Sequence, residues 1–134
     1  MEKHILFVCR YNRFRSVLAE GLFNKYNKDK SIKAKSAGAI KGSPLSENTR
    51  KLAKEFKIKI KRAPQGLSSK LLVWQNTTII VADDVPPQLF DKNKEYGKEV
   101  IVWKIRDANG NGITEMRRIT KEIEKNVKDL VKKV

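Results

Sequence analysis

The chain has 134 residues, enough to bury a substantial core, and we expect residues 1–134 to form one domain. Its 30 Lys and Arg residues against 15 Asp and Glu give a net charge of +15. The basic residues are spread over the whole length without an aromatic-rich basic motif, which argues against nucleic acid as a partner. Apolar runs of a few residues exclude a membrane-spanning helix and do not suit a signal peptide, so we expect a cytoplasmic protein with no membrane partner.

Strand and helix patterns alternate along the first part of the chain. Residues 5–8 form a continuous apolar run of the kind that is buried on both faces of a parallel sheet. From residue 16 to about residue 28, apolar residues recur at spacings of three and four, which predicts a helix. Residues 32–36 alternate as a short strand, and Ser46 is a suitable N-cap for a second helix.

Two further apolar runs, residues 77–82 and 100–105, predict two more strands. The last part of the chain is an amphipathic helix with one apolar stripe of Met116, Ile119, Ile123, Val127, Leu130 and Val134. Strands separated by helices predict an α/β fold in which helices cover a parallel sheet. Such sheets bind ligands at the carboxyl ends of their strands.

The first predicted strand leads directly into Cys9, which is followed by Arg10, Arg13 and Arg15. A loop between a strand and a helix directs backbone N–H groups inward, and the helix N-terminus adds partial positive charge. Such surroundings favour a thiolate, and the two-pronged guanidinium of Arg15 is suited to an oxyanion. The loop therefore predicts a nucleophilic cysteine that attacks a phosphoryl group and forms a cysteinyl-phosphate.

Asp107 follows the last predicted strand, 98 positions after Cys9. Since the carboxyl ends of parallel strands meet at one edge of a sheet, we expect Asp107 to lie near Cys9. The alternative is that Asp107 only forms a turn with the residues that follow it.

Residues 9–20, CRYNRFRSVLAE, resemble the signature C-x-G-N-x-C-R-S-P-x-A-E of the low-molecular-weight protein tyrosine phosphatases. Residues 36–38 (SAG), 82–83 (AD) and 103–107 (WKIRD) are similar to later motifs of that family, in the same order. The resemblance implies a three-layer sandwich: four parallel strands in the order 2-1-3-4, helices on both faces, and a phosphate-binding loop after strand 1.

The resemblance also implies a protein-tyrosine-phosphatase type of phosphomonoesterase that needs no cofactor. Cys9 would be the nucleophile, and Arg15 would bind the phosphoryl group in the transition state. Asp107 would protonate the leaving oxygen and then activate the water that splits the intermediate. Ser16 would donate a hydrogen bond to the thiolate, and Asn12 would brace the loop. The phosphate-binding loop would comprise Cys9, Arg10, Tyr11, Asn12, Arg13, Phe14 and Arg15.

The chain departs from the signature where a substrate would enter. Tyr11 stands in the place of the signature glycine, and Phe14 in the place of its second cysteine. Ala108 and Asn109 follow the acid where the family usually has aromatic residues. We expect these four residues to form the wall of an open pocket. The expected partner is a phosphorylated protein or a small aryl phosphate, and the sequence leaves phosphotyrosine, phosphoarginine and small phosphate esters open.

Cys9 is the only cysteine of the chain and His4 its only histidine, which excludes an internal disulfide and a cysteine-based zinc site. We expect no metal ion, and a monomer rather than an oligomer. Related arsenate reductases pass a disulfide between several cysteines, so arsenate reduction stays an alternative only with an external thiol. The other alternative is a phosphate- or phosphoprotein-binding module with little turnover.

Overall fold

The computed structural model describes residues 2–61, 63–108 and 112–134. Its centre is a four-stranded parallel sheet in the order β2-β1-β3-β4. This confirms the predicted α/β class, the parallel sheet and the strand order. The strands are β1 (Lys3–Cys9), β2 (Ile32–Gly38), β3 (Thr77–Val81) and β4 (Glu99–Trp103).

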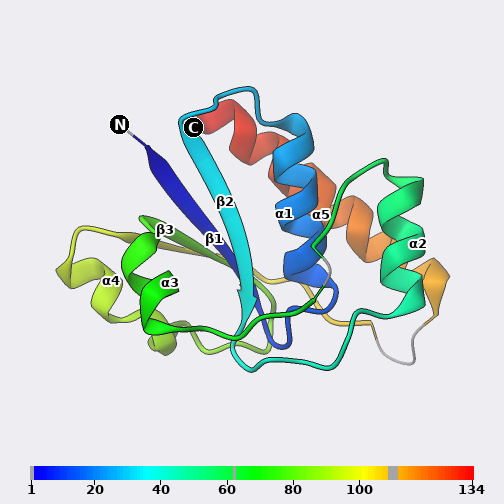
Figure 1. Ribbon diagram of the computed structural model, residues 1–134, viewed down its shortest axis with the longest axis horizontal. Coiled ribbons are helices and arrows are strands. Elements are labelled where there is room, and N and C mark those ends of the chain that lie inside the picture. The colour runs from blue at the N-terminus through cyan, green and yellow to red at the C-terminus, as the bar shows by residue number, and fades with distance from the viewer. Residues whose placement is uncertain (1, 62, 109–111) are drawn as a thin grey trace.

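One face of the sheet is covered by two helices that pack side by side, α1 (Arg15–Tyr26) and α5 (Ile113–Lys133), as Figure 1 shows. The helix α2 (Glu47–Glu55) lies against both of them, and Ser46 caps it by accepting a hydrogen bond from the N–H of Thr49. Apolar side chains of α1, α5 and the sheet form the larger core. The residues of the stripe predicted for the last helix are buried in this core from Met116 to Val127. The final residue of the stripe, Val134, is exposed.

Three short helices lie on the opposite face of the sheet. They are α3 (Ser69–Trp74), the 3₁₀ helix η1 (Pro87–Phe90) and α4 (Lys92–Glu95). Leu71 and Phe90 join the apolar side chains of β1 and β3 in the second core. The sequence did not predict these helices, because segments of four to six residues are too short to display a helical period.

Figure 1 shows the loops after β1 and β2 at one end of the sheet, at the opposite end from both termini. The predicted strand over residues 100–105 was too long, because β4 ends at Trp103. The N–H of Ile105 bonds back to the carbonyl of Trp103 at 2.7 Å and turns the chain. The carbonyl of Ile105 then accepts a hydrogen bond from the N–H of Asp83, at 3.0 Å, so the segments after β3 and β4 are joined.

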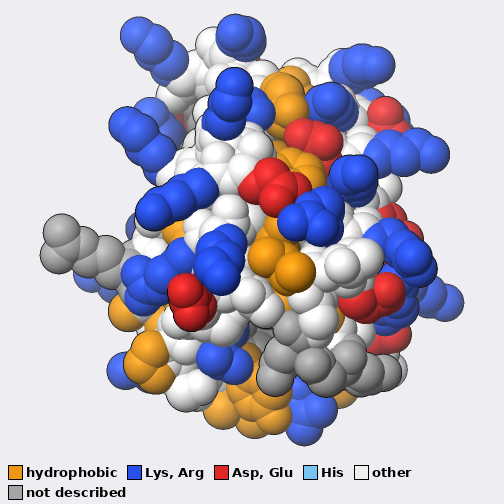
Figure 2. Space-filling view, turned by 90° about the vertical axis from the view of Figure 1, so that its right-hand side faces the viewer, with side chains coloured by type: hydrophobic (Ala, Val, Ile, Leu, Met, Phe, Trp, Pro, Cys, Tyr) orange, Lys and Arg blue, Asp and Glu red, His pale blue; other side chains and the backbone are white. Residues whose placement is uncertain are grey.

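Lysine and arginine side chains are scattered over the face in Figure 2 and do not form a single stripe there. Within the described part of the chain, no helix has both the length and the apolar character needed to cross a membrane.

Candidate active site

The loop that follows β1 wraps around the sulfur atom of Cys9, which is almost fully buried. The backbone N–H of Asn12 points at Sγ from 3.3 Å, and the hydroxyl oxygen of Ser16 lies 2.9 Å from it. The helix α1 begins at Arg15, directly after this loop. A backbone N–H and a hydroxyl group therefore converge on the sulfur at the amino end of a helix, where negative charge is stabilised.

Asn12 holds the loop in shape. Its φ of 55° lies in the left-handed region, which costs energy for a residue other than glycine. The side-chain amide donates to the hydroxyls of Ser16 and Ser36, at 2.7 and 3.0 Å, and its oxygen accepts from the N–H of Gln65 at 3.0 Å. Tyr11 does not have a positive φ. The signature glycine is thus replaced at a position whose backbone accepts a side chain.

Gly38, at the end of β2, lets the loop pack closely against the sheet. A Cβ atom there would lie 2.7 Å from the carbonyl carbon of Tyr11 and 2.8 Å from the nitrogen of Asn12. Any larger residue at this position must therefore displace the loop that follows Cys9.

A second group of polar residues lies behind the loop and centres on the buried Ser36. Its carbonyl accepts hydrogen bonds from Lys61 Nζ at 2.7 Å and Gln65 Nε2 at 2.9 Å, and its hydroxyl donates to Glu20. Burial raises the pKa of Glu20 and lowers the pKa of Lys61. Sequence reasoning missed Lys61 and Gln65, because neither residue belongs to an element or a motif.

Arg15 is 2% exposed and has a fixed orientation. Its Nη1 donates to the carbonyl of Ile105, and its Nη2 donates to Oδ1 of Asp84, both at 2.9 Å. Asp83 and Asp107 each approach the guanidinium to 3.7 Å. Three carboxylates from the segments after β3 and β4 thus surround the buried arginine.

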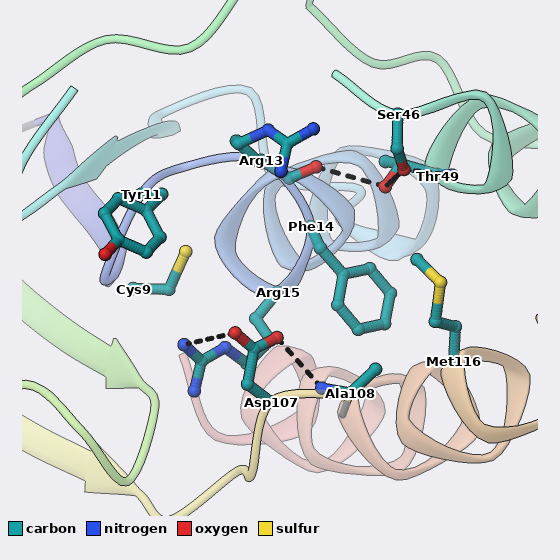
Figure 3. Close-up of a pocket in the computed structure, with 10 residues that line it drawn as sticks. All are labelled: Cys9, Tyr11, Arg13, Phe14, Arg15, Ser46, Thr49, Asp107, Ala108 and Met116. Atoms are coloured by element: carbon teal, nitrogen blue, oxygen red, sulfur yellow. Dashed lines mark hydrogen bonds and ion pairs between the residues drawn. The ribbon is translucent and has the colours of Figure 1, made fainter. Parts of the chain in front are cut away.

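A cavity of about 100 Å³ opens between these groups (Figure 3). Seven of the site residues predicted from the sequence line it, and Asn109 lies outside the described residues. Arg10 is not among its lining residues, because its half-exposed side chain stacks over the Tyr11 ring, 5.1 Å from the centroid. The cavity is lined by Cys9, Tyr11, Arg13, Phe14, Arg15, Ser46, Thr49, Asp107, Ala108 and Met116.

Sequence reasoning did not assign Ser46, Thr49 and Met116 to the pocket. Ser46 had been interpreted only as a helix cap, which it also is, and Met116 only as part of an apolar stripe. The two interpretations concern local structure, whereas the position beside Cys9 depends on how α2 and α5 pack against α1. No local signal could have revealed it.

A buried cysteine that accepts a hydrogen bond from a backbone N–H, with an arginine at the start of the next helix, is the arrangement expected in the class of α/β proteins that bind phosphate-like oxyanions. Solved structures of that class resemble this one over nearly the whole chain. An arsenate reductase from Archaeoglobus fulgidus is 31% identical, with a TM-score of 0.75 and coverage of 95% of this chain and 98% of that one. A low molecular weight protein tyrosine phosphatase from T. tengcongensis is 26% identical, with a TM-score of 0.85 and coverage of 99% and 100%.

The YwlE arginine phosphatase of Geobacillus stearothermophilus shares the fold, at 23% identity and a TM-score of 0.83, with coverage of 98% of this chain and 92% of that one. No curated protein matches the sequence. The model of the low molecular weight phosphotyrosine protein phosphatase family matches residues 4–134. The chain belongs to this family of phosphatases.

Proposed function

We propose that the chain hydrolyses phosphomonoesters through a cysteinyl-phosphate at Cys9, by a mechanism of the protein-tyrosine-phosphatase type. The observation that carries this proposal is the convergence of Cys9, Arg15 and Asp107 on one cavity, although their loops are far apart in the sequence. A nucleophile, an oxyanion-binding guanidinium and a proton donor are the three groups that this reaction requires.

In the first step, the thiolate of Cys9 attacks the phosphorus atom, an S–P bond forms and the P–O bond to the leaving group breaks. Asp107 gives its proton to the departing oxygen. The guanidinium of Arg15, held at Nη1 by the carbonyl of Ile105, stabilises the charge on the equatorial phosphoryl oxygens. Asp107 reaches the guanidinium from the segment after β4, which supports its role beside the same phosphoryl group.

In the second step, Asp107 takes a proton from a water molecule as the water oxygen bonds to phosphorus. The S–P bond breaks and its electron pair returns to Cys9 as the thiolate, with inorganic phosphate as the product. Ser16, 2.9 Å from Sγ, donates a hydrogen bond that makes the sulfur a better leaving group. Asn12 keeps this hydroxyl in place through its own 2.7 Å hydrogen bond.

The pocket wall supports an aryl phosphate, such as a phosphotyrosine side chain of a protein, as the substrate. Tyr11, Phe14, Ala108 and Met116 supply ring faces and apolar groups around the cavity. Tyr11 is 38% exposed, so the wall on its side is partly open. We propose an open slot for a flat ring, without a deep enclosing pocket.

The test is hydrolysis of p-nitrophenyl phosphate and a tyrosine-phosphorylated peptide by the wild-type chain and by Cys9→Ser. We expect turnover by the wild type, none by the variant, and retained binding of vanadate by the variant. Substantial turnover by Cys9→Ser would exclude the cysteinyl-phosphate, and absence of turnover by the wild type would favour a phosphate-binding module.

Arsenate reduction is the second candidate, because the 31% identical relative is an arsenate reductase. Reduction of As(V) to As(III) takes two electrons, which two thiols supply when they become a disulfide. Since Cys9 is the only cysteine of this chain, the second thiol must come from a small molecule such as glutathione. Arsenate-dependent consumption of added thiol, abolished in Cys9→Ser, would support this function.

We also propose that the chain acts without a cofactor, as a monomer in the cytoplasm, on phosphorylated proteins or small aryl phosphates. Activity retained in the presence of EDTA, and a mass near 15.4 kDa in sedimentation equilibrium, are the results expected.

A further inference from the structure

We propose that Arg13 forms a second anion-binding subsite, which takes a carboxylate that the substrate carries beside the phosphoryl group. The preferred substrate class is then a phosphorylated residue with an acidic neighbour, or an aryl phosphate with a carboxylate substituent. The inference rests on the proposed function only in assuming that the phosphoryl group of the substrate binds in the loop at Cys9. Binding of the carboxylate at Arg13 requires no turnover.

Arg13 is in the right place for this role. Its side chain lines the same cavity as Cys9. Figure 3 shows it beside Ser46 and Thr49, away from Arg15 and Asp107, which come from the opposite side. A ligand whose phosphoryl group sits in the loop therefore has Arg13 on one side and the general acid on the other.

The guanidinium of Arg13 is held in a fixed position, and its two Nη groups have no hydrogen-bond partner among the described residues. Its Nε donates to the backbone carbonyls of Ser43 and Pro44, both at 3.0 Å. No carboxylate of the described residues pairs with it. Five other arginines do have such a partner: Arg10, Arg15, Arg106, Arg117 and Arg118. A pre-oriented guanidinium whose two Nη groups can both donate matches the planar geometry of a carboxylate.

The polar groups next to Arg13 do not compete for this role. The hydroxyl of Thr49 donates to the carbonyl of Arg13 at 3.1 Å, and the hydroxyl of Ser46 then donates to the oxygen of Thr49 at 3.0 Å. Both hydroxyl protons are used within the protein. An anion on this wall would therefore meet the Nη groups of Arg13 as its donors.

The side of the cavity opposite Arg13 is rich in carboxyl groups. Asp107 lines the cavity there, and Asp83 and Asp84, which do not line it, lie with Asp107 within 4 Å of the Arg15 guanidinium and offset its positive charge. A carboxylate on the substrate is consequently stabilised on the Arg13 side and destabilised on the other. This asymmetry gives the second anion one favourable orientation.

The experiment uses phosphonates that cannot be hydrolysed: 3- and 4-carboxybenzylphosphonate, and the matching carbamoylbenzylphosphonates as neutral counterparts. Calorimetric titration of the wild type should show that at least one carboxylate ligand binds about tenfold more tightly than its amide, a difference typical of a charge-assisted hydrogen-bonded pair. The preference should weaken as salt rises.

Arg13→Gln should abolish the preference and leave the affinity for the amide ligand within about twofold. Arg13→Lys should retain part of it, because a lysine keeps the charge but loses the fork geometry. Arg50→Gln is the matched control, since Arg50 is an exposed arginine of α2 outside the cavity, and it should keep the full preference. Thermal unfolding of each variant establishes that it is folded.

An unchanged preference in Arg13→Gln overturns the subsite, as does an equal loss of affinity for both ligands, which would mean that Arg13 only shapes the loop. Equal binding of carboxylate and amide by the wild type also overturns it. Turnover of p-nitrophenyl phosphate is measured separately. An inactive protein that keeps the Arg13-dependent preference would refute the proposed function and leave the subsite standing. An active protein without that preference would refute the subsite and leave the proposed function standing.

Discussion

Arg15 donates a hydrogen bond from Nη2 to Oδ1 of Asp84 at 2.9 Å, so the arginine that we propose for phosphoryl binding is already paired with a carboxylate. Asp84 is only 29% exposed, and its other oxygen lies 3.9 Å from Arg10. A phosphate dianion must therefore compete with a like-charged carboxylate for the same nitrogen. This contact is expected to weaken the binding of phosphate.

The first prediction concerns this competition. Asp84→Asn should tighten the inhibition constant for inorganic phosphate about three- to tenfold, because it removes a negative charge close to the oxyanion site. Arg15 should keep its orientation, since the carbonyl of Ile105 still accepts from Nη1. The measurement is competitive inhibition of p-nitrophenyl phosphate hydrolysis. Asp91→Asn, a change of the same charge in an exposed residue near α4, should have no effect; equal tightening by both variants would assign the gain to net charge.

The second prediction concerns Asp107, the general acid that we propose. Asp107→Asn should lower kcat about 10²–10⁴-fold for an alkyl or phenyl phosphate, whose leaving oxygen needs a proton. The loss should be much smaller for p-nitrophenyl phosphate, whose leaving group is already acidic. Asp83→Asn, on the same edge of the sheet, serves as the control. If Asp107→Asn left both classes of substrate unchanged, Asp83 or Asp84 would become the candidate acid.

The sequence was sufficient to predict the parts of the structure that local patterns determine. Apolar runs predicted the buried strands, and the position of Cys9 and Asp107 after two of them predicted that they would share one edge. The pairing of Arg15 with Asp84 was not predictable, because it depends on the turn that brings Ile105 back beside Asp83. The half-buried position of Lys61 likewise depends on how an irregular segment packs across the end of β2.

The third prediction concerns Gly38. Gly38→Ala should lower the free energy of unfolding by about 1–3 kcal/mol, because the new methyl group would overlap backbone atoms, the nearest being the carbonyl oxygen of Ile40 at 2.4 Å. Since Tyr11 and Asn12 are the next neighbours, phosphate affinity should fall as well. Urea denaturation and phosphate inhibition are the two measurements. Gly112→Ala is the control, because no atom of the described residues lies within 4 Å of a Cβ placed there; a comparable loss there would contradict the steric argument.

The fourth prediction concerns pH. Burial raises the pKa of Glu20 above its ordinary value of 4.5, and the hydrogen bond from Ser36 and the charge of Lys61 only partly oppose this shift. A carboxyl whose pKa is higher in the folded state favours unfolding when it ionises. Its cost is absent below pH 4.5 and grows as the pH rises through the folded value. Well below pH 4.5 the carboxyl of Glu20 is neutral in both the folded and the unfolded state.

Glu20→Gln should therefore gain stability relative to the wild type as the pH rises from 4.5 toward neutrality, because the amide cannot ionise. The measurement is the difference in Tm between the two proteins across this range. A difference that is flat or falls with pH would refute the assignment. Glu47→Gln, in the exposed first turn of α2, provides the control.

Phe14 is buried in the core and stands where the family signature has a second cysteine. The presence of phenylalanine in place of this cysteine affects how peroxide inactivates the protein. A thiolate attacked by peroxide becomes a sulfenic acid, which a neighbouring thiol can capture as a disulfide before a second peroxide converts it irreversibly to a sulfinic acid. Cys9 has no such neighbour in this chain, so its recovery depends on small thiols in the surrounding solution. The working lifetime of the site under oxidative stress is accordingly set by the redox state of the cell that contains it.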